Sequence, residues 1–125
     1  MLKVGDTLPE VTFSLRKDGI SSNPSTADIF AGKKIVDAIV CTSVNDAFVM
    51  SAWGDAHNAE HLVMLADGGA DFAKATGMAK ETATFGGTRS VRYAMLVDDG
   101  VVKVLNVEAP GKFAVSDAET MLAVC

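Results

Sequence analysis

The sequence predicts a single α/β domain built on a mixed sheet, and three observations support this class. The chain has 125 residues, which leaves room for one hydrophobic core and no second one. Predicted strands and helices alternate along most of its length, as they do in units with parallel strands. The alternation ends in two β-rich runs joined by Asp98-Asp99-Gly100, a strong signal for an antiparallel hairpin. Parallel and antiparallel strands are therefore expected in one sheet, with helices packed against it.

The first expected elements are a strand and a short helix. In Val11–Arg16 apolar and polar residues alternate, which is typical of a half-buried strand. Lys17–Ser25 follows as a polar turn segment. Thr26–Ala31 is expected to form a helix, because Ser25 is a favourable N-cap and Gly32 a favourable end.

A buried strand and the longest helix are expected next. Ile35–Thr42 is a β-branched apolar run, typical of a parallel strand buried on both faces, although it contains the acidic Asp37. Ser43 is expected to cap the helix Val44–His57, with Asp46 in its first turn. The apolar face of this helix, which we interpret as core packing, comprises Val44, Phe48, Val49, Ala52, Trp53 and Ala56.

The second half of the chain predicts three further strands and two further helices. Ser116 is expected to cap the last helix, with Glu119 three residues later completing a capping box. Glu81–Ser90 is a polar connecting segment with a glycine pair. The expected strands are Leu62–Ala66, Arg92–Val97 and Val101–Val107, and the expected helices are Asp71–Thr76, ended by Gly77, and the segment from Ser116 to Cys125.

Composition and charge narrow the function classes. The chain is 49% hydrophobic and 22% charged, which is ordinary for a globular domain. Eleven basic and sixteen acidic residues give a net charge of −5, which argues against nucleic acid or an anionic membrane as the main partner. No apolar run is long enough to span a bilayer, and the first residues lack a signal-peptide pattern. Two cysteines do not make a disulfide scaffold, so a cytoplasmic location is expected.

Taken alone, the residues give no complete catalytic constellation. His57 and His61 are four apart and could hold zinc, but no third ligand has a suitable spacing, so two surface histidines are favoured. Cys41 is interpreted as a packing residue and Cys125 as an exposed thiol. Arg92 begins a strand predicted to be central, where a guanidinium either pairs with a carboxylate or faces an anionic species. No metal and no cofactor is predicted.

One segment carries a specific resemblance. The string Cys-Thr-Ser-Val-Asn-Asp-Ala-Phe-Val-Met-Ser-Ala-Trp-Gly at Cys41–Gly54 closely resembles the peroxiredoxin-5-type (type II, atypical) peroxiredoxins. The match continues over most of the chain, including Val4–Pro9, Ile29–Lys34, Leu65–Asp67, Arg92–Gly100 and Asn106–Phe113. The resemblance implies a thioredoxin-like (redoxin) three-layer α/β sandwich with a mixed sheet, formed as a single domain over residues 1–125 and lacking one strand–helix unit.

The missing unit lies between the first helix and the strand that carries Cys41. In the family, a strand after the Lys-Lys pair leads into a Pro-x-x-x-Thr-x-x-Cys loop and a long helix. Here Lys33-Lys34 runs directly into Ile35-Val36-Asp37, so a unit on the order of 30 residues is absent. That unit would contain the peroxidatic cysteine, its threonine and its proline. By this interpretation, Asp37 lies mid-run because two half-strands have been spliced.

The resemblance also implies the chemistry of the family. A cysteine thiolate attacks the O–O bond of hydrogen peroxide or an alkyl hydroperoxide and becomes a sulfenic acid, which a second thiol then reduces. By the match, Arg92 is the residue that stabilises the thiolate and peroxide. Cys41 matches a strand cysteine that is not the peroxidatic one, and the resolving position falls near Val115. Glutaredoxin, glutathione or thioredoxin would be the electron donor.

Three interpretations of this chain remain open. It is a thiol peroxidase by descent that is inactive as written, because the peroxidatic loop is absent. Alternatively, it is a non-catalytic deletion variant, a structural or dimer-forming remnant of the fold. In the third interpretation, a segment of the natural chain is missing from the printed sequence. A sheet that lacks a strand exposes an apolar edge, so a homodimer is expected.

Overall fold

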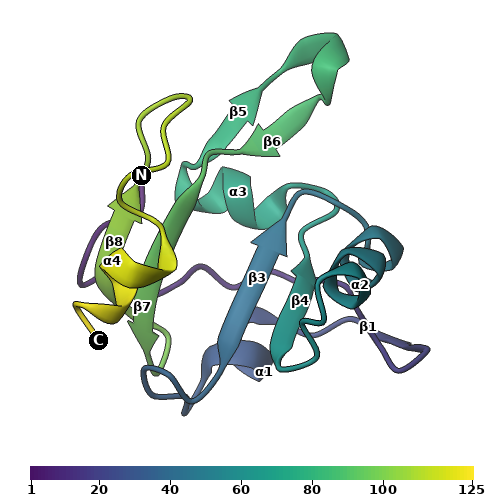
Figure 1. Cartoon of the computed structure of the whole chain (residues 1–125), viewed down its shortest axis with the longest axis horizontal. Helices are drawn as coiled ribbons and strands as arrows, with labels where there is room; N and C mark the ends of the chain where they lie inside the picture. Colours follow the sequence, from purple (N-terminus) through teal and green to yellow (C-terminus); the bar gives the residue numbers. More distant parts are fainter.

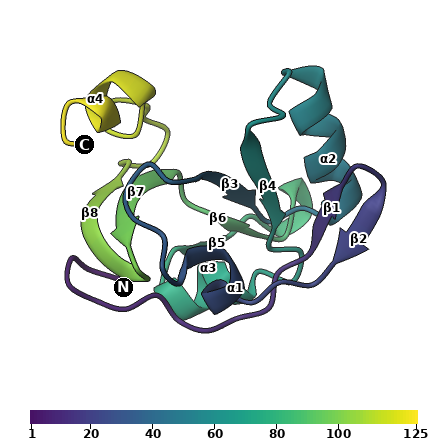
Figure 2. The ribbon, with the colours of Figure 1, turned by 90° about the horizontal axis from the view of Figure 1, so that it is seen from below.

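The computed structural model describes all residues from Met1 to Cys125. Helices lie on both faces of a layer of strands, with α1 and α3 on one side and α2 and α4 on the other (Figure 1, Figure 2). The strands are β1 Leu15–Lys17, β2 Ile20–Ser22, β3 Ile39–Ser43, β4 Leu62–Ala66, β5 Ala79–Glu81, β6 Thr88–Ser90, β7 Tyr93–Asp98 and β8 Val101–Val107. The helices are α1 Thr26–Phe30, α2 Ala47–Ala56, α3 Asp71–Thr76 and α4 Ala118–Leu122, with a 3₁₀ turn at Ala83–Phe85. None of the helices has the length and hydropathy of a membrane span.

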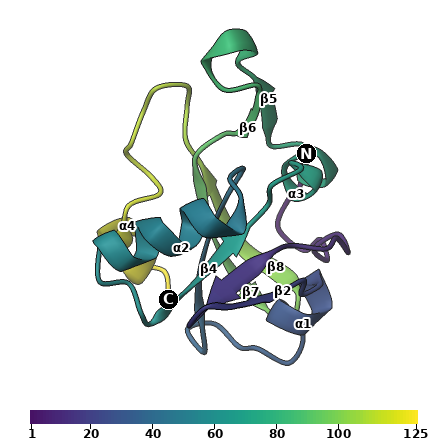
Figure 3. The same cartoon turned by 90° about the vertical axis from the view of Figure 1, so that its right-hand side faces the viewer.

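The strands form four separate pairs. β3 and β4 are parallel, whereas β1–β2, β5–β6 and β7–β8 are antiparallel. Extended N-terminal residues cover two outer edges, since Ser14 bridges to Ala66 in β4 and Thr7 bridges to Val101 in β8. The β5–β6 hairpin projects away from the other elements (Figure 3). Parallel and antiparallel pairing coexist, as expected for the mixed sheet, but no ladder joins the β3–β4 pair to the β7–β8 pair.

Local signals in the sequence account for most element boundaries. Ser25 and Asp28 form a reciprocal capping box at the start of α1. Asp99 and Gly100 connect β7 to β8 with φ angles of 48° and 78°, the left-handed pair that a tight two-residue hairpin requires. Gly77 ends α3 in the left-handed conformation, with φ of 76°. β4 and α3 have the predicted bounds, and β7 and β8 agree within one residue.

Two predicted helix caps are wrong by one or more residues. Ser43 is the last residue of β3, and Asp46 is the N-cap of α2, where its carboxylate accepts a hydrogen bond from the Val49 N–H at 2.9 Å. The last helix is capped by Asp117 rather than Ser116. In both places two capping residues stand close together in the sequence, and the carboxylate bonds the helix start while the serine is used elsewhere.

The predicted strand Ile35–Thr42 is also corrected. β3 begins only at Ile39, because the chain turns at residues 35–37 and Val36 has a left-handed φ of 65°. Asp37 is exposed, and its carboxylate accepts a hydrogen bond from the Lys34 N–H at 2.9 Å. The acidic residue therefore closes a turn and does not interrupt a strand, which removes the burial cost that its predicted position carried.

The interpretation of Phe48 and Trp53 as core residues is wrong. Their side chains are 64% and 45% exposed, and the fully buried positions of α2 are Met50 and Gly54. The helix contacts β4 and β1 through the face that carries these two residues. The Phe48 ring instead lies under the Arg16 guanidinium, with 4.7 Å between the ring centroid and the guanidinium carbon of Arg16. The apolar residues span a wide arc of the helix, and only part of that arc has a sheet to pack against.

The main hydrophobic core lies between the strand layer and the helices α1 and α3, and it is small (Figure 2). Its seven buried members are Leu2, Leu8, Phe13, Leu65, Phe72, Met78 and Val102. The chain exposes 7501 Å² of surface, whereas a folded monomer of its mass is expected to expose about 6,300 Å². The excess of about 1,200 Å² indicates that the molecule leaves open a surface that a closed domain would cover.

Candidate functional site

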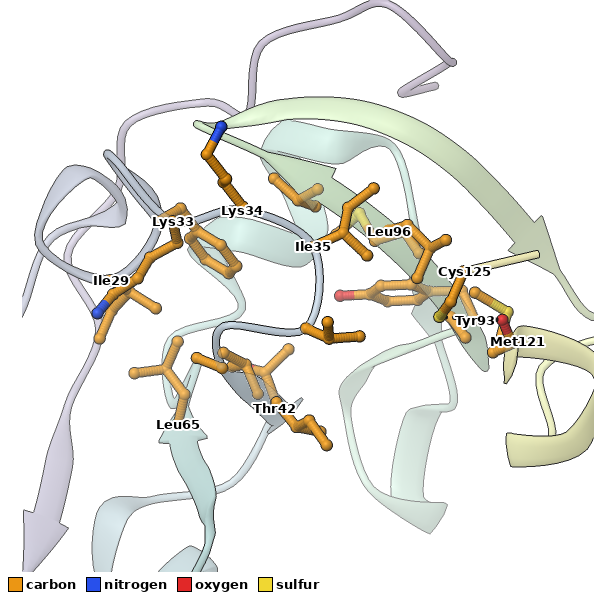
Figure 4. A pocket seen from close by; sticks show the side chains of 18 of the residues that line it. Ile29, Lys33, Lys34, Ile35, Thr42, Leu65, Tyr93, Leu96, Met121 and Cys125 are labelled. Atoms are coloured by element: carbon orange, nitrogen blue, oxygen red, sulfur yellow. Dashed lines mark hydrogen bonds between the residues drawn. The ribbon is translucent and has the colours of Figure 1, made fainter. Parts of the chain in front are cut away.

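A groove of about 370 Å³ separates β3 from β7, and we call it the β3–β7 groove. Its walls are the facing sides of these two strands, and its floor includes the core residues Phe13, Leu65 and Phe72. Nineteen of its 22 lining residues are hydrophobic. Figure 4 shows Lys33 and Lys34 on the side of the groove opposite Met121 and Cys125 of the C-terminal segment. Apart from these lysines, no lining residue is charged.

Both walls of the groove are strand edges whose backbone lacks a partner. No hydrogen bond outside the β3–β4 ladder reaches the backbone of Val40–Thr42, and none outside the β7–β8 ladder reaches that of Tyr93–Asp98. Along a strand, the N–H and C=O groups of one residue point to one edge, and those of the next residue point to the other edge. Half of the groups in β3 and β7 therefore face the groove. The Thr42 hydroxyl, which also lines it, is buried without a hydrogen-bond partner.

The unpaired hydroxyl gives a direct test of the energetics in the groove. Thr42→Val is expected to raise the free energy of unfolding by about 1 kcal/mol, because it removes a buried group that has no partner. Thr76→Val is the matched control, since the buried Thr76 hydroxyl donates to the Phe72 carbonyl at 2.8 Å. That variant is expected to lose about 1 kcal/mol. Urea unfolding measures both, and changes of the same sign would contradict the assignment.

The two walls run in opposite directions. The Asp99 N–H donates to the Lys33 carbonyl at 2.7 Å, and the Gly32 N–H donates to the Asp99 carboxylate at 2.6 Å. β7 therefore ends beside the lysine pair, whereas β3 begins a few residues after it. Any strand placed between them is parallel to one wall and antiparallel to the other.

Cys41 and Tyr93 are both held in their neutral forms. Burial raises the pKa of the half-buried Cys41 thiol, and no neighbouring group lowers it. Burial also raises the pKa of Tyr93, and the nearby Asp67 and Cys41 add to this effect. A nucleophilic cysteine needs the opposite shift, because the thiolate is the reactive form. The structure thus places Cys41 as a packing residue, and it does not line the groove.

Arg92 lies directly before β7, one residue outside the strand that it was predicted to begin, and it does not line the groove. Its side chain is exposed and stacks over the Phe113 ring, with 4.9 Å between the guanidinium carbon and the ring centroid. The two carboxylates that could have paired with it are engaged elsewhere: Asp37 caps a turn, and Asp67 accepts from the Phe72 and Ala73 N–H groups at 3.0 Å. The structural ion pair is therefore not formed, and the guanidinium has an aromatic ring as its neighbour.

The loop that carries Phe113 is held by Glu108. This carboxylate is only 7% exposed and accepts hydrogen bonds from three backbone N–H groups and from the Ser116 hydroxyl, at 2.6 to 2.9 Å. Burial alone would raise its pKa, but the hydrogen bonds from Ser116, Ala114 and Val115 outweigh it and lower the pKa to about 2. Glu108 therefore fixes the segment between β8 and α4, beside Arg92.

This anchor predicts a pH dependence. The folded pKa of Glu108 lies below its ordinary value of 4.5, so the carboxylate stabilises the fold fully above about pH 4.5. That contribution is lost as the pH falls toward about 2. Glu108→Gln is expected to be clearly destabilised at pH 7, with a difference from the parent that shrinks as the pH is lowered. Urea midpoints of both proteins between pH 2 and 7 test this, and a pH-independent difference would contradict it.

The two histidines do not form a metal site with their surroundings. His57 is the C-cap of α2, and His61 lies just before β4. No group of three or more His, Cys, Asp or Glu side chains is placed to hold a metal ion. Of the residues singled out from the sequence, only Cys125 lines the groove. Lys33, Lys34 and Thr42 were missed as site residues, because the sequence does not reveal which strand edges stay unpaired.

Comparisons with known proteins show which proteins this chain is similar to. Residues 26–122 match the family Redoxin. The chain is 50% identical over 98 residues to peroxiredoxin-2E-2, chloroplastic, of Oryza sativa subsp. japonica, covering 71% of this chain and 42% of that protein. It is 34% identical over 155 residues to the hybrid peroxiredoxin hyPrx5 of Haemophilus influenzae, covering 94% of this chain and 64% of the relative. The match covers between 40% and 56% of the first five curated relatives.

Solved structures share the fold. Reduced Prx3 of Vibrio vulnificus in complex with H₂O₂ superposes with a TM-score of 0.96 at 44% sequence identity, over 99% of both chains. Peroxiredoxin 5 of Alvinella pompejana gives a TM-score of 0.73 at 30% identity, over 86% of this chain and 90% of that one. The fold expected from the sequence, a thioredoxin-like arrangement with a mixed sheet, is confirmed by these matches.

Proposed function

The chain belongs to the redoxin family, and on this premise we propose that it is a peroxiredoxin-type thiol-peroxidase scaffold without a peroxidatic cysteine of its own. The observation that carries the proposal is the pair of free strand edges facing each other across the β3–β7 groove. The groove lies where the turn after Lys33-Lys34 leads into β3. The match to hyPrx5 supports the same assignment, because it spans 155 aligned positions whereas this whole chain has 125 residues. The relative therefore has residues within the match for which this chain has no counterpart.

The two cysteines that are present do not supply the missing chemistry. Peroxide reduction requires a thiolate that attacks one peroxide oxygen while the other leaves as water or an alcohol. The Cys41 pKa is raised by burial, which keeps the thiol protonated. Cys125 is exposed, and its thiol donates to the Met121 carbonyl at 3.3 Å, an arrangement that does not orient a peroxide. In this proposal Arg92 is the family's thiolate-stabilising arginine, retained directly before β7 without the thiolate.

Peroxide consumption in the presence of thioredoxin or glutathione tests this proposal. We expect turnover no faster than that of an equal concentration of free thiol, and no change on Arg92→Ala. The double variant Cys41→Ser, Cys125→Ser sets the background. Rapid turnover that Cys41→Ser abolishes would overturn the proposal and identify Cys41 as the nucleophile.

The length of the natural protein is a separate question with a simple measurement. An intact mass near 13.0 kDa would support a true deletion of the strand–helix unit. A mass several kilodaltons higher would show that the natural chain contains a further segment, and the peroxidase activity of the family would then be expected of it.

Partners and location are proposed from the family relation. Peroxide and a glutaredoxin, glutathione or thioredoxin reductant are the proposed partners of the complete catalytic scaffold, in the cytoplasm. A homodimer is proposed as well, supported by the apolar side chains that α2 exposes outside the groove, Phe48, Val49 and Trp53. This surface also favours the second candidate function, a non-catalytic, dimer-forming remnant. Sedimentation velocity across a concentration series tests the dimer, with Trp53→Glu, which introduces a negative charge into this apolar surface, as the disrupting variant.

A further inference from the structure

We propose that the β3–β7 groove binds an extended apolar segment of another polypeptide as an added β-strand, with an acidic residue of that segment beside Lys33 and Lys34. The proposal goes beyond the assignment of a peroxidase scaffold, because it gives the chain a binding activity that involves no thiol. It rests on the two free strand edges, the composition of the lining and the position of the two lysines.

The free edges select a peptide over other apolar ligands. The groove-facing N–H and C=O groups of β3 and β7 have no hydrogen-bond partner in the chain. A lipid tail would cover them without satisfying them, which is costly in an apolar environment. A strand satisfies donors and acceptors on both walls at once, as in other cases of β-strand addition. β3 and β7 have five and six residues, so the bound stretch is expected to have about the same length.

The lining defines the side chains of the bound strand. Core residues such as Phe13 and Phe72 lie on one side of the groove, and Met121 and Leu122 of the C-terminal helix line it as well. A strand between these layers is buried on both faces, so it needs a continuous apolar run rather than alternating residues. Ile39 and Leu122 are 59% and 69% exposed, and they would be covered by such a strand. The surface excess of about 1,200 Å² is within the range that a specific interface buries.

The two lysines of the groove fix the position of the bound segment along the strands, because they attract an acidic residue to one end of the groove. Lys33 and Lys34 are the only charged residues of the lining, and they lie where β3 begins and β7 ends. The chain as a whole carries a net charge of −5, so a highly acidic partner is repelled elsewhere on the surface. One or two carboxylates at the lysine end, followed by an uncharged apolar run, fit this distribution.

A labelled peptide tests the proposal directly. The probe has one glutamate, five Val or Ile residues and a solubilising Gly-Ser-Lys tail, and a second probe carries the same sequence in reverse order. We expect saturable binding of one of the two by fluorescence anisotropy. In hydrogen exchange, the groove-facing amides within Val40–Thr42 and Ala94–Val97, which are those outside the β3–β4 and β7–β8 ladders, are expected to gain protection on binding.

Three comparisons separate strand addition from other modes of binding. A probe N-methylated at alternate residues keeps its apolar surface but loses its backbone donors, and it is expected to bind at least about tenfold more weakly. The double variant Lys33→Glu, Lys34→Glu is expected to weaken binding about tenfold. The double variant Lys103→Glu, Lys112→Glu makes the same change in net charge at exposed positions outside the groove, and it is expected to bind normally.

Several results would overturn the proposal. Equal binding of the parent and N-methylated probes, or displacement of the probe by dodecanoate with no added protection in β3 and β7, would make the groove a lipid cavity. A self-associated state that protects the same amides and excludes the probe would make a second copy the occupant. No binding by either probe would also refute it. None of these measurements involves a thiol or peroxide, so their failure is distinguishable from failure of the peroxidase-scaffold assignment.

Discussion

Replacing Phe13 with alanine is expected to lower the free energy of unfolding by about 3 to 5 kcal/mol, the usual cost of deleting a buried aromatic ring. Phe13 is 2% exposed and packs against Phe72, with 5.3 Å between ring centroids. Both rings belong to the small core that supports the floor of the β3–β7 groove. A domain of this kind has a total stability of about 5 to 15 kcal/mol, so the loss is a large fraction of it.

Phe85→Ala is the matched control, because the Phe85 ring is 90% exposed at the tip of the β5–β6 hairpin. Its effect is expected to stay within about 0.5 kcal/mol. Phe13→Leu keeps most of the volume and allows measurement if the alanine variant does not fold. Urea or thermal unfolding gives all three values. Similar losses for Phe13→Ala and Phe85→Ala would show that the core lies elsewhere.

The second large effect concerns the relative reactivity of the two cysteines. Cys125 is exposed, whereas Cys41 is half-buried with a raised pKa. In the folded protein Cys125 is therefore expected to react with iodoacetamide or hydrogen peroxide at least about tenfold faster than Cys41. Mass spectrometry of each modified cysteine over time measures the ratio, and in urea the two rates are expected to converge.

The variants Cys125→Ser and Cys41→Ser identify which thiol is responsible for each phase. In Cys125→Ser only the slow phase is expected, and it should accelerate on addition of denaturant because opening of the fold exposes Cys41. A fast phase that persists in Cys125→Ser and disappears in Cys41→Ser would contradict the packing role of Cys41.

Sequence reasoning located the elements whose signals are local. β4, α3 and the β7–β8 hairpin follow from short apolar runs bounded by glycine and by Asp-Gly turns, and all lie within one residue of the predicted bounds. The family resemblance also gave the correct fold class. Errors occurred where two local signals competed, as at the caps of α2 and α4, and in the segment before β3.

The candidate site was less accessible to sequence reasoning than the fold. Arg92 was named from its strand position and its family match, and its role stays a prediction. The apolar runs at Ile39–Val40 and Tyr93–Val97 were predicted as strands, but nothing in either run states whether a neighbour pairs with its second edge. The groove and the lysine pair at its end became visible only with the strand pairing.

The sequence by itself determined the family, the order of the four helices and of the strands β1, β3, β4, β7 and β8, and most turns, because these depend on residues close together in the chain. It missed the short strands β2 and β6, which lie in segments predicted as polar turns, and β5. Only the tertiary structure decided which apolar residues are buried, since burial depends on what lies opposite. Phe48 and Trp53 lie on the predicted core face of their helix, yet their side chains are exposed. β3 pairs only with β4, and β7 pairs only with β8, so each keeps one unpaired edge. Whether an apolar surface is core or binding groove is a long-range property, fixed by the partner that packs against it and not by the residues that compose it.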